Sequence, residues 1–189
     1  MAIENDEQLF LALVQASEQL QLVQEYVQRD FSKSAKLRFP RGYLKTAGQW
    51  RHPLRFLADS PLKKNISYTL MLVDVQHWIL ERTDLAGITR DMIVKLQMFL
   101  LGSIVESITK TYLHGICGGN YKRRTSHLHQ QGIISQELCG DLDWLWDTRN
   151  NMHLFQVGGS EWETNQYTES NYIRAQNAYQ GLVTALNAV

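Results

Sequence analysis

All three prolines of the chain, Pro40, Pro53 and Pro61, lie within residues 40–61. Proline breaks a helix because it lacks a backbone N–H and its ring clashes with the preceding turn. This stretch is therefore predicted to be loop with short turns, whereas the rest of the 189 residues can be helical. No part of the chain shows the apolar–polar alternation that is typical of a strand.

Apolar residues spaced three or four positions apart predict helices along the remaining sequence. Residues 120–132 are expected to be a polar connection between two of them. The N-caps of the last three helices are expected to be Thr89, Ser135 and Thr168, because their hydroxyl groups can accept from the first turn. The expected helices cover residues 5–29, 65–83, 89–115, 135–154 and 168 onward.

This arrangement predicts an all-α protein, an up-and-down bundle of about five helices with an irregular basic loop after the first. A chain of this length suits one compact domain overall. Within it, residues 1–64 are expected to form the first helix and a basic arm, and residues 65–189 the bundle.

Composition narrows the class of protein. Hydrophobic residues make up 44% and charged residues 20%, as in folded soluble domains. Two cysteines, Cys117 and Cys139, cannot build a disulfide framework or a zinc knuckle. The acidic N-terminus does not resemble a signal peptide, and no apolar run approaches the roughly 20 residues of a membrane span. We therefore expect a cytoplasmic protein with no membrane contact, metal or cofactor.

The net charge of zero hides an uneven distribution. Residues 1–32 carry six acids and one base, residues 33–64 carry nine bases and one acid, and residues 65–189 carry nine bases and twelve acids. The cations of the middle segment alternate with aromatic rings, which suits phosphate contacts and base stacking. Two other interpretations stay open: a solvated irregular arm, or a segment that docks on the chain's own acidic first helix.

The fourth expected helix carries charged groups where its apolar stripe should continue. The stripe runs through Leu138, Leu142 and Leu145, and the next steps of four reach Arg149 and His153. Residues four apart lie on one helix face, so Arg149 and His153 are expected to be neighbours. Burying a guanidinium is costly unless it is paired. We therefore expect either a carboxylate partner or a face that opens onto a cleft or a subunit interface.

Glu106 is the candidate partner of Arg149. It is a lone acid in the most apolar helix, and it follows Gly102 and Ser103, whose small side chains permit close helix approach. An ion pair with Glu106 would orient the guanidinium and offset its burial cost. The alternative is that Arg149, Glu106 and His153 form a buried polar network that only fixes the helix register.

Residues 132–154, which include the string Arg149-Asn-Asn-Met-His153, resemble the signature helix of HEPN domains. These are small helical bundles common in bacterial toxin–antitoxin and phage-defence systems. The helix that contains Glu106 is similar to the HEPN helix that carries an acid opposite the arginine. The resemblance covers roughly residues 65–189. In the family four to six residues separate the arginine from the histidine, whereas three separate them here.

The resemblance implies a metal-independent endoribonuclease of the toxin or defence type that acts as a homodimer, with RNA as substrate and a cognate antitoxin as partner. The ribose 2′-hydroxyl would attack the adjacent phosphate. His153 would act as acid or base and Arg149 as the cation at the phosphoryl oxygens, with Asn150 positioning substrate and Glu106 holding Arg149. Phosphate contacts are expected from Lys122, Arg123, Arg124, Arg41, Lys45 and Arg51.

The short spacing leaves a second function open, because one residue turns a helical side chain by roughly 100°. This function is a non-catalytic HEPN-like module that binds nucleotide, RNA or a partner protein. A third interpretation is a helical scaffold in which the polar residues are structural.

Overall fold

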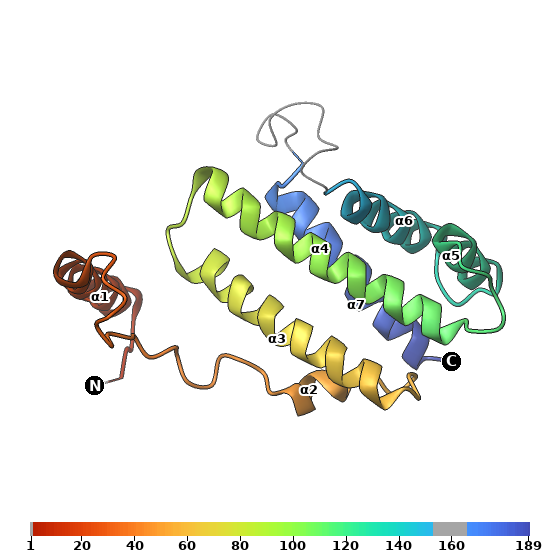
Figure 1. The fold of residues 1–189 in the computed structure, drawn as a ribbon, viewed down its shortest axis with the longest axis horizontal. Helices are drawn as coiled ribbons and strands as arrows, with labels where there is room; N and C mark the ends of the chain where they lie inside the picture. The colour runs from red at the N-terminus through yellow and green to blue at the C-terminus, as the bar shows by residue number, and fades with distance from the viewer. Residues whose placement is uncertain (1, 153–165) are drawn as a thin grey trace. The chain divides into compact units, whose positions relative to one another are not determined.

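The computed structural model describes residues 2–152 and 166–189, and all regular secondary structure in this part of the chain is α-helical. The all-α prediction is therefore confirmed. Figure 1 shows the seven helices of the described residues, two more than expected. They are α1 (Asp6–Val27), α2 (Ala47–Arg51), α3 (Ser60–Arg82), α4 (Gly87–Tyr112), α5 (Tyr121–Gln130), α6 (Gln136–Asn150) and α7 (Glu169–Asn187).

The chain forms two compact units, one ending at Arg41 and the other running from Gly42 to Val189. The first unit contains α1 and the segment after it. The second contains α2 to α7, so the latter part of the expected basic arm folds with the bundle. Leu54 and Leu57, both within that part, are almost completely buried.

Two of the three predicted N-caps are present. Ser135 accepts from the backbone N–H of Leu138, and Thr168 accepts from that of Asn171, as expected for N-caps. The prediction for Thr89 is wrong. α4 begins two residues earlier, after Ala86, and no side chain caps it.

The proline-containing stretch is more helical than predicted. α3 begins at Ser60 instead of residue 65, and it therefore includes Pro61 in its first turn. Proline is tolerated there, since the N–H that it lacks would have no partner within the helix. α2 is a short helix in which Thr46 and Gln49 form a reciprocal capping box.

The expected polar connection over residues 120–132 contains a helix, α5, so that prediction is wrong. The buried residues of α5 lie on one face of the helix. They are Tyr121, Arg124, Thr125 and Leu128. Because two of these four are polar, the helical period does not appear as an apolar stripe. Asn120 caps this helix by accepting from the backbone N–H of Arg123.

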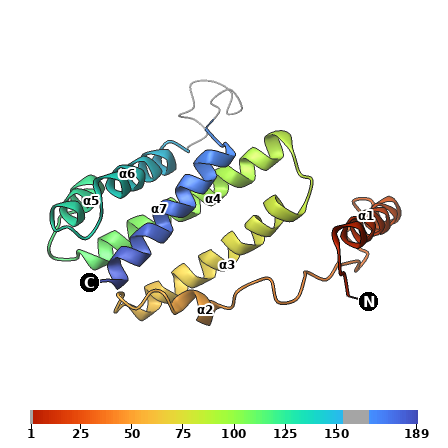
Figure 2. The ribbon, with the colours of Figure 1, turned by 180° about the vertical axis from the view of Figure 1, so that it is seen from behind.

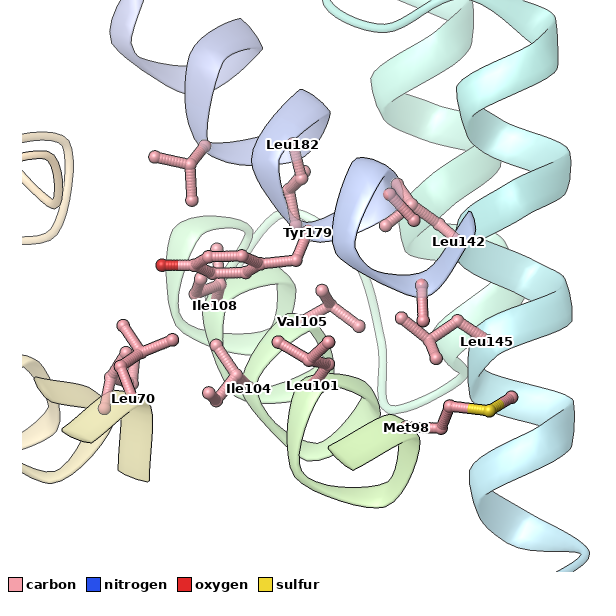
Figure 3. Close-up of a cluster of buried hydrophobic side chains, with 14 of the residues drawn as sticks. Leu70, Met98, Leu101, Ile104, Val105, Ile108, Leu142, Leu145, Tyr179 and Leu182 are labelled. Carbon is pink, nitrogen blue, oxygen red and sulfur yellow. The ribbon is translucent and has the colours of Figure 1, made fainter. Parts of the chain in front are cut away.

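α4 lies at the centre of the second unit and packs against α3, α5, α6 and α7. Figure 2, the reverse view, shows α7 along the other side of α4. In Figure 3 the core side chains of α4, Met98, Leu101, Ile104, Val105 and Ile108, meet Leu142 and Leu145 of α6 and Tyr179 and Leu182 of α7. By length and composition α4 is the one helix among the described residues that passes for a membrane span, and half of its most apolar window is buried. Its central packing accounts for its apolar sequence.

Candidate functional site

The candidate site is built where α6 crosses α4 at Gly102. A Cβ atom at this position would lie 2.8 Å from Cβ of Arg149 and 3.3 Å from the backbone oxygen of Leu145. Only a residue without a side chain lets the two helices approach this closely. The expected close approach of these helices is confirmed.

Three groups contact the Arg149 guanidinium at this crossing. Its Nη1 lies 3.6 Å from Oε2 of Glu106 and donates to Oδ1 of Asn150 at 2.8 Å. Its Nε donates to Oγ of Ser103 at 3.4 Å. Ser103 and Glu106 are three residues apart on α4, so they present their side chains to Arg149 from one face of that helix. The predicted Arg149–Glu106 pair is present.

The Arg149 guanidinium has fixed partners but is only partly buried. The side chains of Arg149 and Glu106 are 30% and 32% exposed. The guanidinium carbon lies 5.5 Å from the centre of the Phe99 ring, which supports it through a cation–π contact. One of the two expected solutions, a carboxylate partner, is therefore present, and the expected opening onto a cleft or a subunit interface stays a prediction. A carboxylate pairs with Arg149, and its face reaches the surface.

α6 is shorter than predicted, and this bears on His153. The helix ends at Asn150 instead of residue 154, and the backbone N–H of Asn151 is shared between the carbonyls of Asp147 and Thr148. Consecutive asparagines, which are poor helix formers, contribute to the early end. The stacking predicted for Arg149 and His153 requires a helix through both residues. His153 lies outside the described residues, and its position relative to Arg149 stays a prediction.

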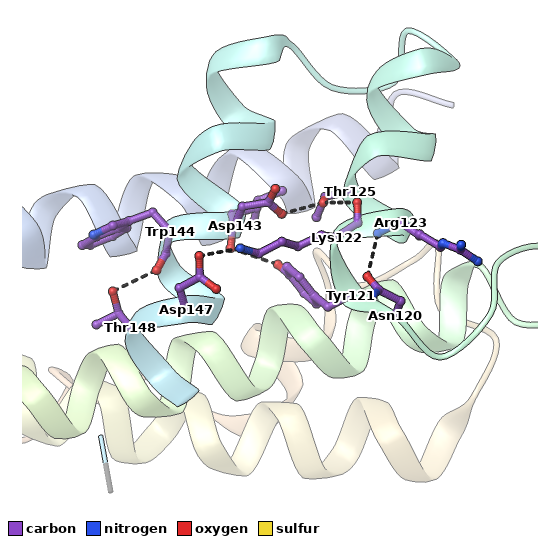
Figure 4. Close-up of polar contacts among 10 residues, drawn as sticks. Asn120, Tyr121, Lys122, Arg123, Thr125, Asp143, Trp144, Asp147 and Thr148 are labelled. Carbon is purple, nitrogen blue, oxygen red and sulfur yellow. Dashed lines mark hydrogen bonds and ion pairs between the residues drawn. The ribbon is translucent and has the colours of Figure 1, made fainter. Parts of the chain in front are cut away.

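The three cations expected near α5 have different environments. Figure 4 shows Lys122 reaching Asp147 of α6, where its Nζ lies 2.7 Å from Oδ2, and Arg123 pointing away from α6. Arg124 is only 2% exposed, and its guanidinium donates to the carbonyl of Gly119 at 3.0 Å. Arg124 thus stabilises the start of α5 and is not placed to contact a phosphate. Lys122 and Arg123 remain accessible.

Two of the cations expected from the basic arm, Lys45 and Arg51, do not join Arg149 on one face. Lys45 extends over the ring of Trp50 at 4.4 Å, and Arg51 lies in α2. α2 packs against α3, and both ribbon views place α3 and α4 between α2 and α6. Arg41 ends the first unit. Within the second unit, Lys122 and Arg123 are therefore the expected cations on the α5–α6 side of the bundle.

Acidic residues of α6 line the same side. Thr125 of α5 donates to Oδ1 of Asp143 at 2.6 Å, a contact drawn in Figure 4. Burial raises the pKa of the Asp143 carboxyl above its ordinary value of 3.8, and the Thr125 hydrogen bond and the charge of Lys122 only partly oppose this. Folding therefore favours the protonated form of Asp143.

We expect the Asp143→Asn variant to gain stability relative to the wild type as the pH rises. In the wild type the unfolded carboxyl ionises first, so the contribution of Asp143 to stability falls as the pH passes from 3.8 through the raised folded pKa. Because the group is partly exposed, the difference should stay below about 1 kcal/mol. Thermal melts of both proteins from about pH 4 to about pH 7 measure it. A difference that is constant or shrinks over this range would contradict the assignment.

Sequence reasoning missed two residues of the site. Ser103 was expected only to permit close helix approach, and Phe99 was not singled out, yet both contact the guanidinium. Their spacing from Glu106, three and seven residues earlier on one helix, is the signal that could have identified them. No cluster of three or more His, Cys, Asp or Glu side chains suited to a metal ion occurs within residues 2–152 and 166–189.

Comparisons with protein-family models, curated proteins and solved structures give no match to this chain.

Proposed function

We propose that the chain is a HEPN-like, metal-independent endoribonuclease of the toxin or defence type that acts as a homodimer. The observation that carries the proposal is the Arg149 guanidinium, oriented by Glu106, Asn150 and Ser103 and still partly exposed. An arginine that served only to fix the helix register would not need an exposed face.

The proposed chemistry is attack of a ribose 2′-hydroxyl on the adjacent phosphate, which leaves a cyclic phosphate and a free 5′-hydroxyl. Negative charge builds on the phosphoryl oxygens during this step, and a fixed, permanently charged guanidinium stabilises it. Glu106 and Ser103 hold Arg149 before substrate arrives, so little reorganisation is needed. Asn150 contacts Arg149 and is placed to bind a phosphate oxygen or a hydroxyl beside it. His153 would transfer the proton.

Lys122 and Arg123 are the proposed phosphate contacts of the second unit. Lys122 would exchange its partner Asp147 for a phosphate, at little cost because both side chains are about half exposed. Arg123 points away from α6 (Figure 4). A protein antitoxin that bound this side of the bundle would compete with RNA.

The test is incubation of the purified protein with total RNA in EDTA. We expect cleavage that leaves 2′,3′-cyclic phosphate ends, and we expect the His153→Ala variant to lose it by at least about 100-fold, as on removal of a general acid–base. The matched control is His114→Ala, which removes an exposed imidazole beyond the end of α4. Equal loss in both variants, or wild-type cleavage that requires a divalent metal, would contradict the proposal.

A second candidate function is a non-catalytic HEPN-like module that binds RNA, a nucleotide or a partner protein. The observation that favours it is the end of α6 at Asn150, because the predicted stacking of His153 on Arg149 rested on a helix through both residues. Absence of cleavage by the wild type, together with RNA binding that is weakened in Arg149→Ala, would support this function instead.

A further inference from the structure

Within the first unit, α1 is an apolar helix without a buried face. None of its 22 residues is buried, and the exposed fractions of Leu9, Leu13, Leu20 and Val23 lie between 39% and 55%. Helices gain most of their stability from packing an apolar face rather than from propensity. A helix that exposes this many leucines and valines is expected to be covered by a partner.

The apolar residues of α1 follow a coiled-coil repeat over three heptads. Their spacing alternates between four and three residues, as for a and d positions. No charged residue occupies the flanking e and g positions. Glu18 and Glu25 both fall at f positions, on the opposite side of the helix. The a and d positions are Leu9, Leu13, Ala16, Leu20, Val23 and Val27.

The net charge of the first unit is negative at the start of α1 and positive after its end, with Glu18 and Glu25 between them and Asp30 among the bases. Glu4, Asp6 and Glu7 are at the start of α1, and no lysine or arginine occurs within it. The bases come after its end. Lys33 folds back onto the last turn, where its Nζ donates to the carbonyl of Tyr26 at 3.3 Å. Like ends therefore repel and unlike ends attract.

We propose that α1 pairs with α1 of a second copy of this chain in an antiparallel coiled coil. In the symmetric register Leu9 opposes Val27 of the second copy, Leu13 opposes Val23 and Ala16 opposes Leu20, so each a position meets a d position. The same register places the acidic start of α1 beside the basic segment that follows α1 of the second copy. A groove beside Val23 and Val27, with a volume of about 640 Å³, would receive the leucines at the start of the partner helix.

Charge makes the other occupants poorer fits. An amphipathic helix that binds an anionic membrane carries Lys and Arg on its polar face. α1 carries only acids there, and an anionic lipid surface or a nucleic acid would repel it. The pairing uses residues outside the HEPN-like region and does not depend on RNA cleavage.

Cysteine cross-linking of the full-length chain tests the pairing, with Cys117→Ser in all proteins. We expect a mixture of Leu9→Cys and Val27→Cys chains to form an intermolecular disulfide, and Leu9→Cys alone to form none. Cross-linking of Leu9→Cys with itself would overturn the antiparallel arrangement. Failure of the mixed chains to cross-link would overturn the pairing.

Sedimentation of chains that carry no introduced cysteine provides the second readout. Leu20→Glu places a charge in the contact and should weaken the α1 association at least about 100-fold, lowering the oligomeric mass. Leu11→Glu is the matched control, since Leu11 is at an f position, opposite the contact, and its replacement should leave the mass unchanged. Equal masses for Leu20→Glu and wild type, or recruitment of wild type to anionic vesicles, would overturn the proposal.

Discussion

Replacing Gly102 by valine is expected to lower the free energy of unfolding by about 1–3 kcal/mol, as for overpacking at a closely packed contact. The new Cβ would lie 2.8 Å from Cβ of Arg149, and the backbone oxygen of Leu145 is only 3.3 Å away. Neither atom is the flexible end of a side chain, so α6 as a whole must move from α4. Denaturant unfolding measures the loss.

The matched control is Gly140→Ala on α6. A Cβ at Gly140 meets nothing within 4 Å. Glycine in a helix interior costs conformational entropy, so this variant should be about 0.4–1 kcal/mol more stable than the wild type. An unchanged or increased stability of Gly102→Val would show that the helices do not cross as closely as described.

The second large effect is expected on RNA cleavage in Arg149→Ala. Removing a preorganised cation from a site of developing negative charge typically costs about 100-fold to 1000-fold in rate. The cost in stability should be below about 1 kcal/mol, because Arg149 and Glu106 are both about one-third exposed and the carboxylate left behind can be hydrated. A metal-free cleavage assay and a thermal melt separate the two effects.

Two further variants define how Arg149 acts. Arg149→Lys keeps the charge but cannot contact Glu106, Asn150 and Ser103 together, so we expect it to rescue cleavage only in part. Arg174→Ala is the control for loss of a paired arginine. Arg174 donates to Asp141 at 2.7 Å and lies over Trp144. It should leave cleavage unchanged, and a loss as large as that of Arg149→Ala would show that the effect is structural.

The Arg149–Glu106 contact could be predicted because both residues broke a pattern. A cation on a leucine stripe and an acid within the long apolar stretch of α4 each need a partner, and small residues marked where the two helices could meet. The contacts of Ser103 and Phe99 with Arg149 could not be predicted, because each residue is ordinary at its position. Only the crossing of α4 and α6 brings them to the guanidinium.

Helix positions were predictable where apolar period and caps agreed, as in α1, α6 and α7. Helix positions were not predictable where buried polar residues took the place of apolar ones. Arg124 was read as a surface cation, yet it is buried and bonded to a backbone carbonyl, and with Thr125 it hides the period of α5. The last residues of α6 were misread for a related reason. An apolar pattern continues past Asn150, but the helical hydrogen bonds from a backbone N–H to the carbonyl four residues earlier end with Asn151.

The most direct test of the proposed reaction is a double-mutant cycle on RNA cleavage in EDTA, with Arg149→Ala, His153→Ala and both together. Groups that act as one catalytic unit are strongly non-additive. We therefore predict that the double variant cleaves about as slowly as the slower single variant. Losses that multiply, or a wild-type protein that leaves RNA intact, would contradict the claim that the two residues serve one reaction.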